Sequence, residues 1–495
     1  MQPKRIHLIA AARPNFMKVA PLYHALAQEK WCTPHIVHTG QHYDANMSDA
    51  FFRDLRLPEP AHHLEVGSGT HAEQTGRTMI AYEAVCLRER PDAIVVVGDV
   101  NATVACAIVG TKLWIPVIHL EAGLRSRDRR MPEEINRLAT DAIADLLWTP
   151  SPDADENLRA EGVPAQKIVC IGNIMIDSFE MLRGKIESAE TRRKLGLDGR
   201  PYAVVTLHRP SNVDEREKLT ELVTTLVALS HELQVVFAIH PRTRKRLEDF
   251  GLLSAIDGAP GIRSTEPLSY IEFMNVITGC TLAITDSGGV QEETTYLGIP
   301  CATLRENTER PITITEGTNR LLKPEGLVAA ARDALEGKWR AGRKPALWDG
   351  HAAYRAEESL RKLLSALAAP LSPTGSYPAS RGACGLGGRK ASSSTWKSHP
   401  FVTKAAAPRR LTSRATSSLF ARPLKIITRN SGMAAVSSST SGRPLPPCNM
   451  RSRITTSAEA SRAAASTSVA SDTCPTHCMS GSVSMSWLMT SLKSR

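Results

Sequence analysis

Carboxylates stand directly after two short apolar runs in the first part of the chain. Asp99 follows residues 93–97, and Glu121 follows the run that begins at Pro116. A carboxylate in such a position can exchange protons with a bound substrate. Because an unneeded charge beside a buried strand would be costly, Glu121 is the stronger candidate for catalysis.

Histidines and glycines occupy the corresponding positions in the second part of the chain. His208 follows residues 203–207, and a Ser-Gly-Gly sequence leads into a predicted helix over residues 290–297. Glycines let the backbone approach a diphosphate, a helix N-terminus adds N–H donors, and an acid in the first turn could accept hydrogen bonds from a ribose. The candidates for this anion site are Ser287, Gly288, Gly289 and Arg310, and the candidate for the ribose is Glu292 or Glu293.

Each of these residues also has an ordinary structural interpretation. Asp99 could cap a helix, and Glu133 and Glu134 could simply complement the dipole of the helix that follows Pro132. His208 taken singly resembles a solvated loop histidine. The functional interpretation depends on all of them following strands at one edge of a sheet, where ligands of parallel sheets bind.

Short β-branched runs alternate with longer segments of helical spacing, which predicts an α/β protein with parallel sheets. The predicted strands are residues 6–9, 93–97, 116–120, 203–207, 235–239 and 282–285. A polar helix over residues 173–190 and a turn at 197–201 interrupt the alternation. We therefore expect two Rossmann-like, doubly wound domains with the active site in the cleft between them.

The expected domain boundaries follow from this pattern. Residues 1–175 form the N-terminal Rossmann-like domain, residues 176–345 the C-terminal Rossmann-like domain that holds the candidate anion site, and residues 346–369 a closing helix. Residues 370–495 are rich in Ser, Ala, Arg and Pro and show no sustained period, so we expect a disordered tail. Our hypothesis is that this tail is appended sequence without a part in the function.

The charge distribution and the cysteines indicate which partners and which cellular compartment to expect. The 495 residues carry a net charge of +11, but residues 371–495 hold 17 basic and 2 acidic side chains and the first 370 hold 44 and 48. Nucleic-acid binding is therefore disfavoured. No run of 18 apolar residues occurs, so no membrane partner is expected. The front cysteines lie mostly in apolar runs, as in a reduced cytoplasmic protein.

The sequence contains no recognisable cofactor or metal motif. Gly67-Ser-Gly69 loosely matches a dinucleotide-binding loop, but Thr70 and Glu73 fit a helix capping box equally well. Walker A and zinc-ligand spacings do not occur, and Cys474-Pro-Thr-His-Cys478 has too few ligands. We expect no cofactor and no metal.

Taken together, the motifs resemble those of the non-hydrolysing UDP-N-acetylglucosamine 2-epimerases, in order from residue 6 to about 367. The matching segments are Arg13-Pro14 with Lys18, Gly98-Asp99, His119-Leu-Glu-Ala-Gly-Leu-Arg125, Pro132-Glu-Glu-Ile-Asn-Arg137, Thr206-Leu-His-Arg209, Thr285-Asp-Ser-Gly-Gly-Val-Gln-Glu-Glu293 and Thr308-Glu-Arg-Pro311. The resemblance implies a GT-B-like homodimer without a cofactor that interconverts UDP-GlcNAc and UDP-ManNAc for surface polysaccharides. Family enzymes eliminate UDP to give a 2-acetamidoglucal and then add it back.

The resemblance also implies roles for individual residues. Asp99, Glu121 and Glu133 match the catalytic acids, and His208 matches a histidine that stabilises the diphosphate. The positions that match substrate-binding residues are Arg13, Lys18, Phe273, Ser287, Gly288, Gly289, Glu293 and Arg310.

Two alternatives remain open at this stage. Related epimerases that act on UDP-2,3-diacetamido-2,3-dideoxy-glucuronic acid share the same motifs, and the extra carboxylate of that substrate would need a cation. Arg127, Arg129 and Arg130 could supply it or could be solvated loop charges. The other alternative is a GT-B glycosyltransferase that uses the same UDP site. The loop at residues 43–47 lacks the arginine of members that UDP-GlcNAc activates, which leaves allosteric activation open.

Overall fold

The computed structural model describes residues 2–40 and 52–368, except for the side chain of Arg13. These residues all belong to one compact unit that spans residues 1–381. The predicted tail over residues 370–495 lies outside the described part of the chain. Among the described residues, no helix is both long and apolar enough to cross a membrane.

The first sheet has seven parallel strands in the order β3-β2-β1-β4-β5-β6-β7. The strands are β1 (Lys4–Ala10), β2 (Cys32–His38), β3 (His62–His63), β4 (Ala93–Val97), β5 (Val117–Leu120), β6 (Leu146–Thr149) and β7 (Ile168–Cys170). All five residues of β4 are buried, as expected for a strand covered on both faces. The strand order reverses between β1 and β4, and such a reversal marks the place where doubly wound sheets bind ligands.

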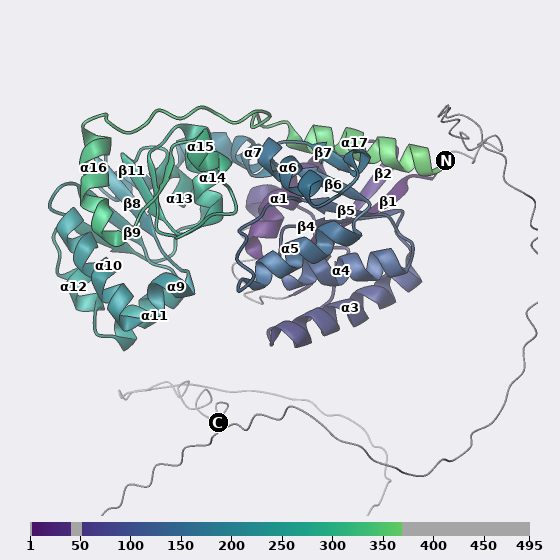
Figure 1. Cartoon of the computed structure of the whole chain (residues 1–495), viewed down its shortest axis with the longest axis horizontal. Coiled ribbons are helices and arrows are strands. Elements are labelled where there is room, and N and C mark those ends of the chain that lie inside the picture. The colour runs from purple at the N-terminus through teal and green to yellow at the C-terminus, as the bar shows by residue number, and fades with distance from the viewer. Residues whose placement is uncertain (1, 41–51, 369–495) are drawn as a thin grey trace, which may run out of the picture. The chain divides into compact units, whose positions relative to one another are not determined.

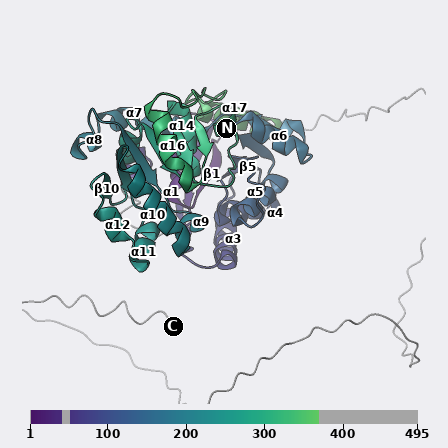
Figure 2. The same ribbon diagram turned by 60° about the vertical axis from the view of Figure 1, so that its left-hand side comes forward.

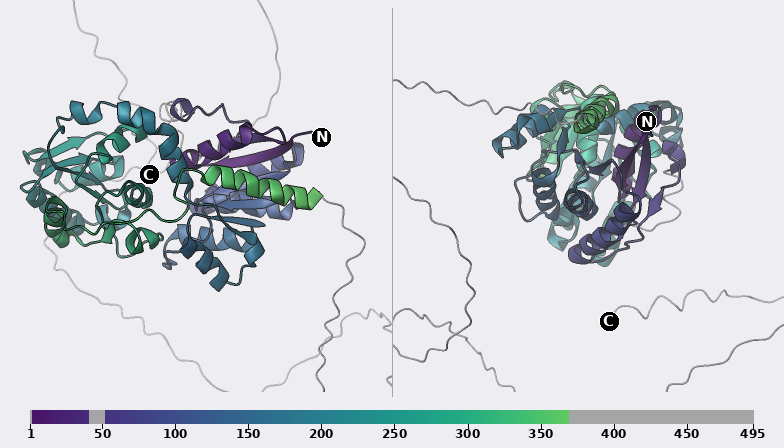
Figure 3. Two further views of the ribbon diagram at one scale, coloured as in Figure 1. Left: turned by 90° about the horizontal axis from the view of Figure 1, so that it is seen from above. Right: turned by 90° about the vertical axis from the view of Figure 1, so that its right-hand side faces the viewer.

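Helices cover both faces of this sheet (Figure 1). One face packs against α1 (Arg13–Ala27), α7 (Ile174–Ser188) and α17 (Ala352–Ala368), and the other against α3 (His71–Arg88), α4 (Asn101–Lys112), α5 (Pro132–Ile143) and α6 (Pro152–Ala160). Figure 3 shows α17 beside the first strands, although it comes last in the described chain. Trp31 Nε1 donates a hydrogen bond to Glu357 Oε1 over 2.8 Å and thereby attaches α17 to this sheet.

The second sheet has six parallel strands in the order β10-β9-β8-β11-β12-β13, with a reversal between β8 and β11. The strands are β8 (Tyr202–Thr206), β9 (Gln234–Ala238), β10 (Ile262–Thr265), β11 (Leu282–Thr285), β12 (Cys301–Thr303) and β13 (Asn319–Leu321). Both sheets are therefore doubly wound, as the alternating sequence pattern predicts.

Nine α-helices of the described chain belong to this second half. They are α8 (Thr191–Lys194), α9 (Pro210–Val213), α10 (Arg216–Leu229), α11 (Pro241–Asp249), α12 (Leu253–Asp257), α13 (Tyr270–Ile277), α14 (Gly288–Leu297), α15 (Ile312–Thr315) and α16 (Leu327–Leu335). Figure 2 shows α9 to α12 grouped together, and they pack against one another. Short 3₁₀ turns at Ala165–Lys167 and Pro324–Gly326 complete the chain.

The helix α7 departs from its prediction as a polar helix. Its apolar side chains, including Ile176, Phe179 and Leu182, are buried, because α7 packs against α1 on one side and against α13 and α14 on the other. Of its charged residues, Asp177 is buried, Glu180, Arg183 and Lys185 are half-buried, and Glu187 is exposed. This helix therefore contributes to the core rather than serving as a solvated link.

Candidate active site

Glu121 follows β5 with a backbone conformation that glutamate rarely adopts. Its φ angle is +75°, in the left-handed region that is unfavourable for residues other than glycine. Its own N–H and that of Ala122 both donate to Trp148 O, over 3.1 and 3.0 Å, which holds the turn in place. Backbone strain of this kind concentrates at functional sites.

The carboxylate of Glu121 lies between two cations. Lys18 of α1 forms a short ion pair with Oε2, and Arg310 Nη2 donates to Oε1 over 2.8 Å. Burial by itself would raise the pKa of Glu121, but Lys18 and Arg310 outweigh that effect and the pKa is lowered. The structure thus brings three predicted site residues together and keeps Glu121 ionised.

Arg310 is the centre of a larger buried cluster of charges. Its Nε lies 2.8 Å from Glu292 Oε1, and its Nη1 donates to Glu309 Oε1 over 2.5 Å. Burial raises the pKa of Glu292, and Arg310 opposes the rise without cancelling it. Of the two first-turn acids considered from the sequence, Glu292 is therefore the one that contacts Arg310.

Asp99 follows β4 and is held by a buried arginine from α5. Its carboxylate pairs with Arg137, and Asn136 Nδ2 donates to its backbone carbonyl over 2.8 Å. Burial raises the pKa of Asp99, the pairing with Arg137 opposes that rise, and the charge of Glu121 adds to it. Asp99 is not the N-cap of α4, because that position belongs to Val100.

The neighbouring acids Glu133 and Glu134 have different surroundings. Glu134 is buried, accepts hydrogen bonds from the N–H groups of Ser126 and Arg127 over 3.0 and 2.9 Å, and pairs with Arg137. Glu133 is half-buried, and nothing in the described part of the chain forms a hydrogen bond or ion pair with its side chain. Glu134 thus fixes the loop, whereas the carboxylate of Glu133 is available to a ligand.

At the reversal point of the second sheet, His208 after β8 meets Asp286 after β11. His208 Nδ1 lies 2.8 Å from Asp286 Oδ1, and the N–H groups of His208 and Arg209 also donate to this fully buried carboxylate. The ring of His240 lies 5.5 Å from that of His208. Burial works against ionisation of Asp286, but His208 and these donors lower its pKa, so a carboxylate orients His208.

The two glycines at the start of α14 differ in the space beside them. A Cβ on Gly288 would lie 2.5 Å from Arg310 Nη1, whereas a Cβ on Gly289 would meet no atom within 4 Å. Ser287 is the N-cap residue, and its N–H donates to Thr285 Oγ1 over 2.9 Å. Gly288 therefore makes room for Arg310, and Gly289 leaves open space at a helix N-terminus.

Glu293 and Phe273 lie on the inner sides of α14 and α13. Glu293 is buried and accepts a hydrogen bond from Tyr270 Oη over 2.8 Å. Burial raises the pKa of Glu293 to about 8, with the hydrogen bond from Tyr270 opposing the shift and Glu292 adding to it. Phe273 is half-buried against the core. Glu293 is accordingly protonated at neutral pH.

Two further predictions concern α1 and α3. Arg13 is the first residue of α1, but its side chain lies outside the described part of the structure. The capping box is confirmed, because Glu73 N–H donates to Thr70 Oγ1 and Thr70 N–H donates to Glu73 Oε2. The Gly67-Ser-Gly69 sequence thus leads into an ordinary helix cap.

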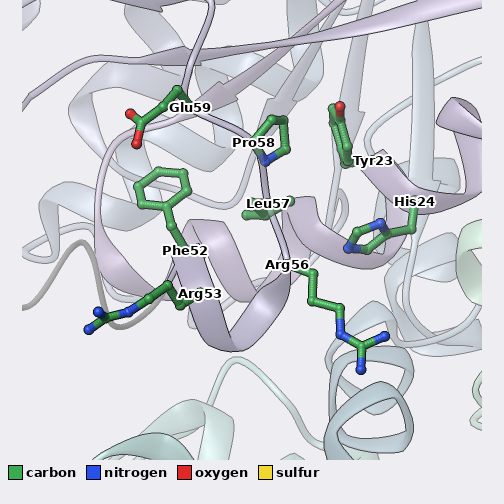
Figure 4. Close-up of a pocket in the computed structure, with 8 residues that line it drawn as sticks. All are labelled: Tyr23, His24, Phe52, Arg53, Arg56, Leu57, Pro58 and Glu59. Atoms are coloured by element: carbon green, nitrogen blue, oxygen red, sulfur yellow. The ribbon is translucent and has the colours of Figure 1, made fainter.

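The hollow shown in Figure 4 lies apart from these residues. It is lined by Tyr23, His24, Phe52, Arg53, Arg56, Leu57, Pro58 and Glu59. Tyr23 and His24 come from α1, and the other side chains come from the segment before β3. None of the candidate catalytic residues lines this hollow.

The sequence profile of the family described as UDP-N-acetylglucosamine 2-epimerase matches residues 24–361. The chain belongs to this family. The UDP-N-acetylglucosamine 2-epimerase of Methanocaldococcus jannaschii is 42% identical over 344 residues, which cover 68% of this chain and 93% of the relative. The resemblance inferred from the motifs is therefore confirmed.

Two other comparisons extend this membership of the epimerase family. The UDP-2,3-diacetamido-2,3-dideoxy-D-glucuronate 2-epimerase of Pseudomonas aeruginosa is 38% identical, over 72% of this chain and 100% of its own length. A crystal structure of the M. jannaschii epimerase in complex with UDP-GlcNAc and UDP has a TM-score of 0.67 at 40% identity, covering 72% of this chain and 99% of the other. The GT-B-like α/β fold is thus confirmed.

Several contacts of the candidate site were not predicted from the sequence. Arg137 belongs to one of the matching motifs without an expected role of its own, although its position three residues after Glu134 in a helix suggests an ion pair. Asp141 lies 2.6 Å from His119 Nδ1 and also pairs with Arg125. A buried histidine in a strand needs a partner, but the sequence does not indicate which acid provides it.

Proposed function

We propose that this member of the epimerase family interconverts UDP-GlcNAc and UDP-ManNAc. The observation that carries the proposal is the position of Glu121, a strained and buried carboxylate between Lys18 and Arg310. A deprotonated acid beside cations suits a reaction in which a proton moves and a diphosphate leaves. Family membership supplies the substrate class.

The chemistry requires proton transfer at C2 and release of UDP. The C2 proton is not adjacent to a carbonyl in the ring, so elimination of UDP to a 2-acetamidoglucal offers a lower barrier than direct deprotonation. Re-addition of UDP with protonation from the other face of C2 gives the epimer. Acid–base groups are therefore needed on two faces of the sugar.

We assign these acid–base roles to Asp99, Glu121 and Glu133. Glu121 is ionised and suits a base, whereas burial favours the protonated form of Asp99 and suits a proton donor. Glu133 contributes a carboxylate that the described residues leave unpaired. The three acids reach the substrate from the loops after β4 and β5 and from the first turn of α5.

Stabilisation of the departing diphosphate belongs to groups of the second half of the chain. His208, oriented by Asp286, and Arg310 provide donors for the negative charge that develops on the leaving group. The open N-terminus of α14 provides backbone N–H groups for the same phosphates. The remaining substrate-binding positions in this proposal are Arg13, Lys18, Phe273, Ser287, Gly288, Gly289 and Glu293.

The proposal extends to the organisation of the protein. Residues 1–175 and 176–345 act as two domains, and residues 346–369 close the first. The enzyme works as a cytoplasmic homodimer without a cofactor and supplies a surface-polysaccharide precursor.

Incubation with UDP-GlcNAc in D2O tests the proposed reaction. Proton NMR should show deuterium at C2 of the sugar together with the signals of UDP-ManNAc. A glycosyltransferase would leave the C2 proton in place, and UDP-GlcNAc that keeps this proton would contradict the proposal.

The 2,3-diacetamido glucuronic acid derivative is the second candidate substrate. The match to the full length of the P. aeruginosa enzyme favours it. Of the three arginines considered for its carboxylate, exposed Arg130 pairs with half-buried Asp128, and Arg127 donates to Asn157. Arg129 is exposed and has no partner in the described part of the chain, so it remains available. Parallel assays of the two UDP-sugars, with Arg129→Gln as the variant, decide between them.

A further inference from the structure

Three histidines gather on one face of the first sheet, at its β3 edge. His7 of β1 lies opposite His35 of β2, and His62 of β3 lies opposite Val37 in the register of the parallel strands. Side chains two residues apart on a strand point to the same face, so His35 and Val37 share a face. All three imidazoles therefore point to the face that α3 covers.

Each of the three rings offers a nitrogen that lies within 4.8 Å of those of the other two. Each ring also has one buried nitrogen without a hydrogen-bond partner among the described residues, namely His7 Nε2, His35 Nδ1 and His62 Nε2. His7 itself is fully buried. Buried polar atoms are seldom left unpaired, which points to a ligand that accepts three nitrogen lone pairs.

Groups around the cluster supply the outer contacts of a metal site. Tyr82 Oη of α3 lies 3.1 Å from His7 Nδ1 and fixes the ring that would bind through Nε2. Glu89, directly after α3, places Oε2 3.7 Å from His62 Nε2 and offers a fourth ligand or a counter-charge. Arg5 and Arg88 are the cations nearby, and Arg5 Nη1 lies 3.8 Å from the same Glu89 oxygen.

We propose that His7, His35 and His62 form a binding site for a divalent transition metal, with Zn²⁺ as the best match. Three imidazole nitrogens with one carboxylate or water make a common tetrahedral zinc environment. Tetrahedral Zn–N bonds place nitrogens about 3.3 Å apart, so the partly exposed rings of His35 and His62 need to move inward by about 1.5 Å. The three ligands lie within β1, β2 and β3, and neither Glu121 nor Asp99 belongs to the site, so it does not depend on the proposed reaction.

The metal would stabilise the edge of the sheet rather than take part in epimerisation. The edge strand β3 has only two residues and pairs with β2 alone. A metal held by ligands from three adjacent strands would connect β3 to the body of the sheet. Bound metal should therefore raise the thermal stability of the protein, with the logarithm of the free metal concentration once this exceeds the dissociation constant.

The test uses the full chain, stripped with a chelator and titrated separately with Zn²⁺ and Co²⁺. Calorimetry should give one Zn²⁺ per chain, with a higher melting temperature. Co²⁺ should give the visible absorption of a tetrahedral nitrogen and oxygen site without a thiolate charge-transfer band. Such a band would assign the binding to cysteines, as in Cys474-Pro-Thr-His-Cys478, and would overturn the proposal.

Substitutions in the two partly exposed ligands locate the site without removing the buried His7. His35→Gln and His62→Gln should each weaken Zn²⁺ binding by at least about tenfold and abolish the metal-dependent rise in melting temperature. His63→Gln is the matched control, because His63 lies on the same strand but is exposed. Circular dichroism without metal verifies folding. No saturable binding by the wild type, or equal binding by all variants, would overturn the proposal.

Discussion

Arg310 Nη2 donates to Glu121 Oε1 over 2.8 Å, although Glu121 follows a strand of the first sheet and Arg310 follows a strand of the second. The same guanidinium that neutralises the proposed base is a donor for the proposed leaving group. Binding of a diphosphate by Arg310 would therefore draw a cation away from Glu121 and make this carboxylate a stronger base. Under the proposed roles, substrate binding and activation of the base would thus be coupled through one side chain.

Glu121→Gln should abolish turnover while leaving UDP affinity within a few-fold of the wild type. Loss of an acid–base group lowers kcat by about 10²- to 10⁴-fold, whereas the amide retains the shape of the side chain. Turnover is measured by NMR and UDP binding by calorimetry. Glu217→Gln, an exposed change on α10, is the control and should be silent. Near-wild-type turnover of Glu121→Gln would refute the assigned role.

Arg137→Gln should shift the pH profile of kcat. Burial raises the pKa of Asp99 and Arg137 opposes that rise, so removing the guanidinium should raise the pKa further. The limb of the profile governed by Asp99 should then move to higher pH. Because Glu134 also loses a buried partner, folding is verified by circular dichroism first. If the pH profile of kcat is unchanged, or shifts to lower pH, Asp99 does not take part in the rate-limiting proton transfer.

Gly288→Ala and Gly289→Ala form a matched pair at the start of α14. The new methyl group at 288 would collide with Arg310, so this variant should lose stability and activity together. The methyl group at 289 meets open space, and alanine favours the helix by about 0.5–1 kcal/mol. Gly289→Ala should therefore be as stable as the wild type but bind UDP more weakly. If a folded Gly289→Ala protein binds UDP as tightly as the wild type, the phosphates do not bind at the N-terminus of α14.

Glu293→Gln should flatten the pH dependence of stability between pH 4.5 and 8. The pKa of Glu293 rises from 4.5 to about 8 on folding, so in this range the folded protein holds a proton that the unfolded chain has lost. The free energy of unfolding therefore falls as pH rises through this window, by about 2–4 kcal/mol. Glutamine carries no such proton, so the variant should be the more stable protein at pH 8.5. Urea titrations at pH 5 and 8.5 give the free energy of unfolding of each protein at the two pH values. If this free energy changes equally with pH in the variant and the wild type, the raised pKa of Glu293 is contradicted.

The sequence pattern was sufficient for the architecture because buried parallel strands are continuous apolar runs. The runs at β1, β4, β8 and β11 are of this kind, and they include both reversal points. The short strands β3, β7 and β13 have two or three residues each, too few for any periodicity. They exist because neighbouring strands provide hydrogen-bond partners, which is a tertiary effect.

The candidate site was predictable in its residue types but not in its pairings. Strand ends identify Asp99, Glu121 and His208, because position along a strand is a local property. That Arg137 pairs with Asp99, and that Glu292 rather than Glu293 contacts Arg310, depends on helix rotation and on contacts between distant segments. The same reason hides the His7, His35 and His62 cluster, whose members lie far apart in the sequence and in no ligand motif.

The packing of α17 on the first sheet has a consequence for how the protein is made. This helix ends the described chain, yet its residues Glu357 and Ser359 accept hydrogen bonds from Trp31 and Trp148 of the first half. When only the first half of the chain has left the ribosome, α17 is still missing, and part of the apolar face of the first sheet is exposed to water. The strands of the first sheet are synthesised early, but the sheet can complete its folding only after α17 has been synthesised. A fragment that stops before residue 352 should therefore aggregate rather than fold.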